Sequence, residues 1–383
     1  EFTDTAGSIF RSDIGALAMA DITLGCNPPA NDRFCPDEPV RRNQMASFLR
    51  RSMGLEPIAV PARPTVTLAF TGDTLIHLTV TTQAARDGAR RGVRFDFGPM
   101  VERVRPLVEP ADLALCHLEV PLDPTSTGVS GYPLFNAPAE VADGLADIGF
   151  DGCSTASNHS LDQGIEGILD TLEVLERRGL GSAGMFADQQ TAGAATRYRL
   201  DDLDVAHLSA TFSLNGLRLP AGREWMLQRI VEDQILTAAA DARRSGADFV
   251  ILSLHCCTEY QTPPTPFQRQ VARRLIGSPD IDLIVGHHAH VIQPVEQVGD
   301  EYIVYGLGNF LSGQQFEPRV SDGVVVYADI SPRGEHWSVR EISAAPTRVV
   351  DGSYRIVPVS AATASWHRTM GTLRALGVEV EAR

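Results

Sequence analysis

Carboxylate, amide and imidazole side chains recur where short apolar runs of this sequence end. Eight of the ten histidines lie between His77 and His290. The apolar runs end in five polar groups, which are Thr71-Gly72-Asp73, His117-Leu118-Glu119, Ser157-Asn158-His159-Ser160, His255, and Gly286-His287-His288-Ala289-His290. Mixed oxygen and nitrogen ligands suit hard to borderline divalent ions, and a spare carboxylate can bridge two ions about 3.5–4 Å apart. The combined pattern therefore predicts a centre for two divalent metal ions.

Each of these motifs, taken singly, has a simpler structural explanation. A lone histidine at a strand end is more often a hydrogen-bonded structural residue, and a lone Gly-Asp is a turn signal. Glu119 by itself fits a solvated or Arg-paired carboxylate, and Cys256 and Cys257 beside His255 fit core residues better than metal ligands. The argument for metal therefore rests on the occurrence of all the motifs together, in chain order.

The segments that carry these side chains are typical of buried strands that alternate with helices. The β-rich runs are TVTLAF, ADLALCHLEV, FDGCSTAS, VAHLSATF, DFVILSLHC, DLIVGHH and YIVYGLGNF, with helical patterns at 160–178 and 228–245. Several runs are apolar on both faces, as strands of a covered sheet are. We expect one layered α/β domain over residues 65–345. A C-terminal extension, 346–383, should add a strand near 355–359 and a helix near 361–376, packed on the core.

Residues 1–58 form a separate small helical unit, joined by the Pro/Ala linker 59–64. Apolar residues follow a helical period around Ile14 and again around Met45, on either side of a Pro-rich loop. Two helices bury little surface alone, so we expect this unit to pack against sister copies or the main domain.

Six cysteines bear on the redox compartment. Cys26 and Cys35 flank the short loop NPPANDRF, and a disulfide between them would imply an oxidising, extracytoplasmic setting. Two unrelated thiols remain the alternative. The other four cysteines lie in apolar stretches and are predicted to be buried thiols.

Charge and composition exclude several function classes. All 33 basic residues are Arg, against 48 acidic residues and a net charge of −15, so broad nucleic-acid binding is not expected. Without a Lys the chain has no Schiff-base chemistry and no phosphate-binding loop of the Lys type. No apolar run approaches the ~20 residues of a membrane span. The sequence opens at Glu1 without Met, and we read it as a mature or trimmed chain.

From Thr65 to about Phe310 the sequence resembles the poly-γ-glutamate (capsule) synthesis CapA-type family of the calcineurin-like metallophosphoesterase superfamily. The matching stretches are AFTGDTLIH, ADLALCHLEVPL, TASNHSLDQG, LHCCTEYQTPPTPFQRQVARRLI, IDLIVGHHAHVIQPVE and YGLGNF. The resemblance implies a four-layer α/β/β/α sandwich with two divalent ions (Mn, Zn, Fe or Mg) at one edge. Family members usually have Asn where this chain has His117, and Trp-Gly where it has Cys256-Cys257.

The resemblance also implies a role for each motif residue. The first ion would be held by Asp73, His77 and His290, with Glu119 as the bridging carboxylate; the second would be held by Asn158, His255 and His288. His159 would be the general acid beside the leaving group, and Asp162 and Asn309 are the other catalytic candidates. A basic run that includes Arg86, Arg90 and Arg91 would attract an anionic polymer, with a solvated helix face as the alternative.

The leading functional expectation is a metal-dependent hydrolase of the cell surface that acts on poly-γ-glutamate or a related envelope polymer. A non-catalytic, polymer-binding accessory protein and a generic phosphomonoesterase or phosphodiesterase are the alternatives. Residues 1–58 resemble one S-layer homology module, on the evidence of Phe2, Asp13-Ile14, ITLGC (22–26), Cys35-Pro36 and Arg42 with Met45-Ala46. That resemblance implies contact with a cell-wall polymer and an extracytoplasmic, cell-surface or secreted location.

Overall fold

The computed structural model describes residues 2–5, 8–20, 22–23, 32–35, 45, 48–49, 51–53, 65–334 and 336–383. The chain divides into two compact units, residues 1–63 and 64–383. In the first unit, α1 (Arg11–Met19) buries Ile14. The carboxylate of Asp4 accepts hydrogen bonds from the backbone N–H of Phe34 at 2.7 Å and of Cys35 at 2.8 Å. Cys26 and most of the second helical run lie outside the described residues.

The second unit contains two large β-sheets. The larger sheet consists of β1 (Val66–Leu75), β2 (Leu113–Leu118), β5 (Gly152–Ser154), β6 (Gly181–Ala183), β13 (Asn309–Ser312), β14 (Asp322–Arg333), β15 (His336–Val349), β16 (Ile356–Pro358) and β17 (Glu381–Ala382). Its order is β16-β15-β14-β1-β2-β5-β6, with β13 paired to β1 and β17 to β15. The smaller sheet consists of β7 (Thr196–Leu200), β8 (Leu203–Thr211), β9 (Phe249–His255), β10 (Leu283–His287), β11 (Val295–Val298) and β12 (Glu301–Val304). Its order is β11-β12-β10-β9-β8-β7.

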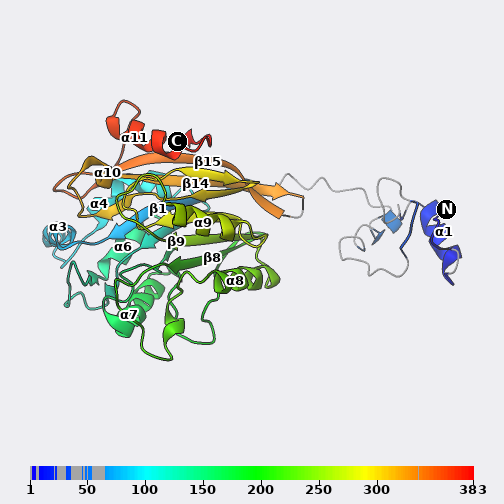
Figure 1. The fold of residues 1–383 in the computed structure, drawn as a ribbon, viewed down its shortest axis with the longest axis horizontal. Helices are drawn as coiled ribbons and strands as arrows, with labels where there is room; N and C mark the ends of the chain where they lie inside the picture. Colours follow the sequence, from blue (N-terminus) through cyan, green and yellow to red (C-terminus); the bar gives the residue numbers. More distant parts are fainter. Residues whose placement is uncertain are drawn as a thin grey trace. The chain divides into compact units, whose positions relative to one another are not determined.

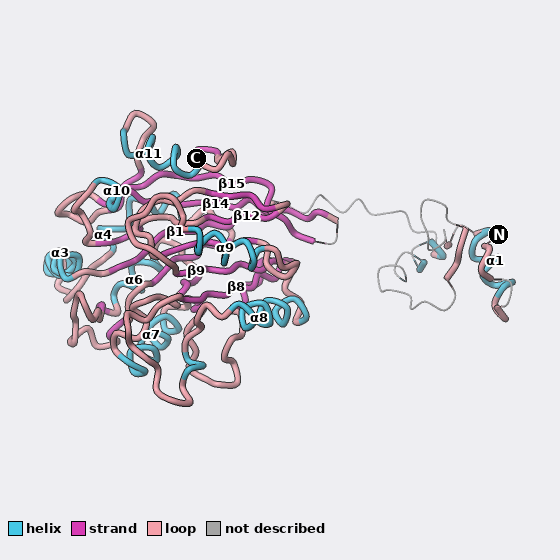
Figure 2. The backbone as a smooth tube through the Cα atoms, in the orientation of Figure 1, coloured by secondary structure: helices cyan, strands magenta, loops and turns pink. Residues whose placement is uncertain are grey.

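Helices cover the outer faces of both sheets. They are α3 (Leu78–Ala89), α4 (Gly98–Val101), α5 (Arg105–Val108), α6 (Glu140–Asp147) and α7 (Gly164–Arg177) on the larger sheet, and α8 (Glu232–Arg244) and α9 (Pro266–Ile276) on the smaller. A further helix, α11 (Ala364–Leu373), lies beside β14 and β15 (Figure 1). Figure 2 shows strands through the middle of this unit, with α7, α8 and α11 at its outside.

Side-chain alternation along the strands builds the layers. In β1, Ala69 packs towards the helices, whereas Leu68 and Phe70 enter the core between the sheets. In β9, Ile251 faces that inter-sheet core and its neighbour Val250 faces the helices. Each strand of a sheet covered on both faces is therefore apolar throughout, as the sequence suggested. The four layers confirm the expected α/β/β/α sandwich.

A bulge in β1 aims Asp73 at the sheet edge. The strand does not end at Phe70, as the sequence suggested, but continues to Leu75, and its register with β2 shifts between Phe70 and Asp73. A side chain at Gly72 would meet the carbonyl oxygen of Gly308 at 2.0 Å, and the N–H of Asp73 donates to that same oxygen at 2.9 Å. A β-bulge re-directs the side chain that follows it, so Gly72 permits the close approach that fixes Asp73.

Candidate metal centre

The predicted site residues lie at the carboxyl ends of parallel strands from both sheets. Asp73 is on β1, Glu119 directly follows β2, His255 ends β9, and His288 follows β10. β1 and β2 are parallel, as are β9 and β10, so their carboxyl ends point the same way. Ligand sites in sheets with parallel strands form at such ends.

Two buried groups of ligand-type side chains lie at this edge. One consists of Asp73, His117 and His255, and the other of Glu119, His288 and His290. Within each group one ligand atom per residue lies within 4.8 Å of the others. The groups also contact one another, because Nδ1 of His290 lies 2.9 Å from Oδ2 of Asp73.

Glu119 lies between two imidazoles. Its Oε1 is 3.7 Å from Nε2 of His255 and 3.7 Å from Nε2 of His290. Both distances are too long for a hydrogen bond, and neither carboxylate oxygen has a hydrogen-bond partner among the described residues. A buried carboxylate without a partner is costly unless a cation compensates it. The donor set of Glu119 and the surrounding imidazoles therefore fits divalent metal.

The charges of these side chains shift one another's pKa values. Burial raises the pKa of Glu119 well above its usual range. Burial also raises that of Asp73, but hydrogen bonds from His287 and His290 outweigh it and bring the pKa well below its usual range. Burial lowers the pKa of His290, yet Glu119 and Asp73 outweigh that effect and raise it to about 9. Such opposed pKa shifts are expected where carboxylates and imidazoles are buried together, and a bound cation would neutralise the carboxylates.

Asn158 and His159 follow β5 and face different partners. Oδ1 of Asn158 lies 2.8 Å from Nε2 of His255, and its Nδ2 donates to Oδ1 of Asn215 at 3.3 Å. Nδ1 of His159 lies 2.7 Å from Oδ2 of Asp162, and that oxygen also accepts the backbone N–H of Phe135 at 2.7 Å. Successive side chains of this loop thus diverge, with Asn158 at the metal groups and His159 at Asp162.

His77 and Asn309 stand beside the two groups. Nδ1 of His77 contacts the carbonyl of Leu75 at 3.1 Å and the N–H of Gly313 at 3.2 Å, and the residue belongs to neither metal group. Oδ1 of Asn309 lies 3.1 Å from Nδ1 of His290, and its Nδ2 donates to the carbonyl of Val320 at 2.9 Å. Asn309 therefore orients His290 so that Nε2 faces Glu119.

The three arginines expected to attract substrate lie at the other end of α3 from His77. All three are exposed, and two of them pair with an acidic side chain, Arg90 with Asp87 at 3.0 Å and Arg91 with Asp96 at 3.0 Å. Twelve helical residues separate the two ends of α3, which is about 18 Å. Contact with a substrate held at the metal groups therefore requires an extended molecule.

Three residues to which the sequence analysis assigned no specific role also contribute to the site, namely His117, His287 and Asn215. His117 stacks on His287, with ring centroids 4.1 Å apart, and belongs to the group of Asp73. The spacing of His117 two residues before Glu119 was a usable signal, because it places both on one side of a strand. Asn215 contacts Asn158 from a loop after β8, and nothing in its sequence context indicated this.

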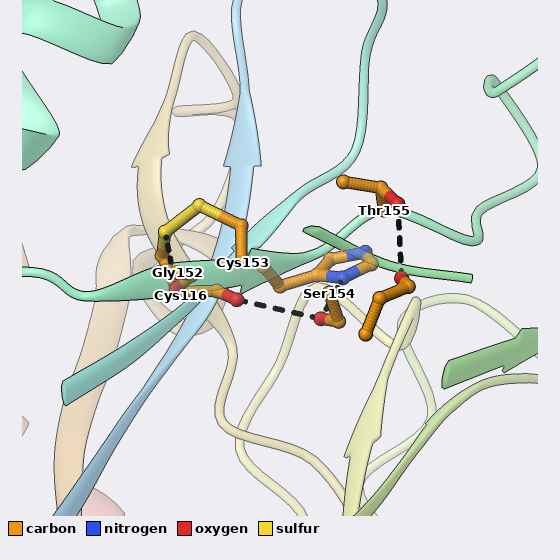
Figure 3. The surroundings of a disulfide bond; sticks show 7 residues. Cys116, Gly152, Cys153, Ser154 and Thr155 are labelled. Carbon is orange, nitrogen blue, oxygen red and sulfur yellow. Dashed lines mark hydrogen bonds between the residues drawn. A yellow bond between two sulfur atoms is a disulfide. The ribbon is translucent and has the colours of Figure 1, made fainter. Parts of the chain in front are cut away.

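The expectation of four buried thiols is wrong, because the structure pairs Cys116 with Cys153 and Cys256 with Cys257. Cys116 and Cys153 are 37 residues apart in sequence but are direct partners in the parallel pair β2–β5. Figure 3 shows this bond across the two strands, beside Ser154 and Thr155. Strand pairing between distant segments, which the sequence does not display, brings these sulfurs together.

Comparison with known proteins gives a family match over most of the second unit. Residues 67–314 match the family described as bacterial capsule synthesis protein PGA_cap. The chain is 29% identical over 191 residues to the PGA biosynthesis protein CapA of Bacillus subtilis, covering 50% of each. It is 25% identical over 230 residues to the capsule biosynthesis protein CapA of Bacillus anthracis, covering 59% of this chain and 54% of that one.

A third relative is the probable polyglutamine synthesis accessory protein of Mycobacterium tuberculosis, 29% identical over 168 residues, covering 41% of this chain and 44% of that one. The chain thus spans about half the length of the curated relatives it matches. Among solved structures, the calcineurin-like phosphoesterase YfkN of Bacillus subtilis aligns with a TM-score of 0.46 at 13% identity, covering 80% of this chain and 96% of that one. The family match over residues 67–314 confirms the resemblance to the capsule synthesis family that was read from the sequence motifs.

Proposed function

This chain belongs to the bacterial capsule synthesis protein family PGA_cap, and from that premise we propose that it is a cell-surface hydrolase with two metal ions. Its substrate would be poly-γ-glutamate or a related anionic envelope polymer. The observation that supports this most is the buried carboxylate of Glu119, which lacks a hydrogen-bond partner among the described residues and has Nε2 of two histidines at 3.7 Å.

In this proposal the ligand-type residues divide around Glu119 as the family resemblance implies, which differs from the two groups of close ligand atoms. Asp73 and His290, with His77 beside them, would hold one ion, whereas Asn158, His255 and His288 would hold the other. A pair of bound divalent ions supplies an activated water and stabilises negative charge on a carbonyl or phosphoryl oxygen. The excess of imidazole over carboxylate favours Zn or Fe over Mg or Mn.

His159 is the proton donor in this proposal. Its Nδ1 lies 2.7 Å from Oδ2 of Asp162, which orients the ring and leaves Nε2 to face a leaving group. The ring of Phe135 packs edge-on against His159, with centroids 4.7 Å apart, and excludes water from one side. Arg86, Arg90 and Arg91 would contact a distant part of a long anionic substrate.

An accessory role without catalysis is the second candidate. It is favoured by the Mycobacterium tuberculosis relative, whose name describes an accessory protein of polymer synthesis. In that case the chain binds the polymer, and the metal centre serves its structure. A general phosphomonoesterase or phosphodiesterase is the third candidate.

The N-terminal unit would serve as a wall-binding module of the S-layer homology type. The side chains of Met45, Leu49 and Met53 are about half exposed or more, at 47%, 49% and 65%. In this proposal these exposed apolar side chains would take part in the contact with the cell-wall polymer. Among the described residues, no helix has the length and apolar character needed to cross a membrane.

One set of measurements separates these candidates. Metal per chain is determined first on the purified protein, and turnover is then measured on poly-γ-glutamate and on a generic phosphate ester, with Glu119→Ala as the control. Metal-dependent cleavage of poly-γ-glutamate supports the proposal. Cleavage of the phosphate ester alone favours the phosphoesterase, and polymer binding without turnover favours the accessory role.

A further inference from the structure

The two ring nitrogens of His255 face different surroundings. Nε2 lies 2.8 Å from Oδ1 of Asn158 and 3.7 Å from Oε1 of Glu119. Nδ1 lies 2.9 Å from Nε2 of His117. His290 is arranged in the same way, with Nε2 towards Glu119 and Nδ1 towards Asp73 at 2.9 Å and Asn309 at 3.1 Å. Both histidines therefore turn Nε2 towards the carboxylate that lacks a partner, and Nδ1 towards a hydrogen-bonding side chain.

Ser154 contacts the other ring nitrogen of His117. Its Nδ1 lies 2.7 Å from Oγ of Ser154, and that hydroxyl can donate to the carbonyl of Cys116 at 3.4 Å. His117 is fully buried and Ser154 nearly so. The donor and acceptor of each of these hydrogen bonds are fixed once Nε2 of His255 carries a lone pair. Nδ1–H of His255 then donates to Nε2 of His117, Nδ1–H of His117 donates to Ser154, and Ser154 donates to Cys116.

The pairing of β2 with β5 fixes the position of Ser154 relative to His117. His117 and Ser154 are direct partners in the pair β2–β5, next in register to the disulfide-bonded partners Cys116 and Cys153. Figure 3 shows Ser154 beside this disulfide. The covalent link therefore lies one residue away from the hydrogen bond between His117 and Ser154. Slippage of either strand would break both contacts.

We propose that His117 is a positioning residue, which accepts the Nδ1 proton of His255 and so commits Nε2 of His255 to a metal ion. Metal-binding histidines commonly donate their other N–H to an acceptor that fixes the ring orientation, and loss of that acceptor typically costs 10–100-fold in metal affinity. In this chain the acceptor is itself an imidazole. The proposal rests on the metal binding of the proposed function but not on turnover.

The competing arrangement makes His117 a metal ligand itself. Asp73, His117 and His255 have ligand atoms within 4.8 Å of one another, so these three side chains could surround one ion. That ion would use Nδ1 of His255 and leave Nε2 facing Asn158 and Glu119. The positioning role is preferred because Nε2 of both His255 and His290 lies at the same distance from Glu119.

The test measures zinc binding to the full chain for His117→Ala, His117→Gln and Ser154→Ala. A matched control is His207→Ala, because His207 is also buried and also contacts a serine, with Nε2 2.9 Å from Oγ of Ser253 on the neighbouring strand. Zinc dissociation constants come from competition with a chelator, zinc per chain from saturated protein, and folding from the melting temperature without metal. Visible absorption of the cobalt-loaded protein reports the number of ligands.

A positioning role predicts that His117→Ala weakens zinc binding by about 10–100-fold while the number of ions at saturation stays the same. Ser154→Ala should weaken binding less, His117→Gln should restore most of the affinity through its amide oxygen, and His207→Ala should bind as the wild type does. The cobalt spectrum should keep its intensity in His117→Ala. Loss of one whole ion in both His117 variants, with an altered cobalt spectrum, would instead make His117 a ligand.

Two outcomes separate this inference from the proposed function. A wild type that binds zinc but cleaves nothing refutes the hydrolase and leaves the positioning role measurable, because affinity is the readout. Unchanged zinc affinity in His117→Ala refutes the positioning role, whatever the turnover. A wild type that binds no divalent metal refutes both.

Discussion

Nδ1 of His159 lies 2.7 Å from Oδ2 of Asp162, and both side chains are buried in the turn that follows β5. The same carboxylate oxygen accepts the backbone N–H of Phe135. Two hydrogen bonds to one oxygen hold Asp162 in place, and Asp162 in turn fixes the orientation of His159. The pair thus has the geometry of an oriented acid or base that is separate from the two groups of ligand-type side chains.

The first prediction concerns His159. The variant His159→Ala should keep its bound metal and lose turnover by about 10²–10⁴-fold, because a positioned proton donor contributes that much. Asp162→Asn should lose part of the same rate, since it leaves the ring in place with a weaker partner. Metal per chain and turnover are measured together on the substrate that the wild type accepts.

The controls for His159 are His288→Ala and Glu119→Ala, which should lose metal and turnover together. If His159→Ala loses metal as severely as His288→Ala does, His159 is a ligand and the assignment is wrong. If it keeps both metal and full rate, His159 is a structural residue.

The second prediction concerns the stability of the metal-free protein. Glu119 is a buried carboxylate with no hydrogen-bond partner among the described residues. Glu119→Gln removes that charge at the same size, so without metal it should raise the melting temperature. With saturating zinc the order should reverse, because the wild type gains stability from the ions that the variant no longer binds. Scanning calorimetry with and without a chelator measures both; the same order in both conditions would argue against a cation at Glu119.

The third prediction concerns the link between β2 and β5. Cys116→Ala/Cys153→Ala opens a cross-link that spans 37 residues, and the loss in the free energy of unfolding should be about 4 kcal/mol from chain entropy. Denaturant unfolding of the oxidised protein and the double variant gives the difference. Titration of thiols in the unfolded, unreduced wild type should find Cys116, Cys153, Cys256 and Cys257 unreactive. Labelling of Cys116 or Cys153 under those conditions would show that the pairing is wrong.

The fourth prediction is a dependence on pH away from the metal groups. Burial, with Asp282 and Asp300 adding to it, raises the pKa of Glu301 from 4.5 to about 7. Because the carboxyl pKa is higher in the folded protein than in the unfolded chain, the protonated carboxyl contributes its full stabilisation below pH 4.5. This contribution to the free energy of unfolding is lost as the pH rises towards 7. Glu301→Gln should therefore flatten the decline in melting temperature between pH 5 and 7. At pH 8 the melting temperature of the variant should exceed that of the wild type by about 2 °C, after allowance for solvent screening. An unchanged pH profile in the variant would contradict the shift.

Local patterns in the sequence carried most of the information about the layers. Apolar runs such as Phe249–His255 are short and apolar on both faces, so they indicate covered strands directly. The helix expected at 160–178 corresponds to α7, Gly164–Arg177, whose buried residues repeat every three to four positions. The long hairpin of β14 and β15 was not anticipated. Successive residues of β14 alternate between the two cores, as Val324 and Val325 do, but β15 contains the exposed pair Arg340 and Glu341, which interrupts its apolar pattern.

The site could be predicted in part. Polar residues at strand ends, such as Asp73 and His255, converge because parallel strands end at one edge, and that rule needs only the order of strands. The partners of those residues do not follow from any such rule. Asn215 lies 57 residues from Asn158, and the Cys116–Cys153 link depends on which strands are neighbours. Such contacts are set by tertiary pairing, which no local pattern encodes.

The position of β1 within its sheet has a consequence for synthesis of the chain. β1 is an early strand of the domain, yet one of its edges pairs with β14, where Val66 is opposite Ile330, and with the start of β13 at Asn309. As the chain leaves the ribosome, that edge stays unpaired until both later strands have emerged, and an unpaired edge attracts other strands. Pairing between segments so far apart also slows folding. The nascent protein therefore has to keep this edge of β1 from aggregating until residues 309–330 have emerged, and Asp73, which pairs with Asn309, takes its final place only then.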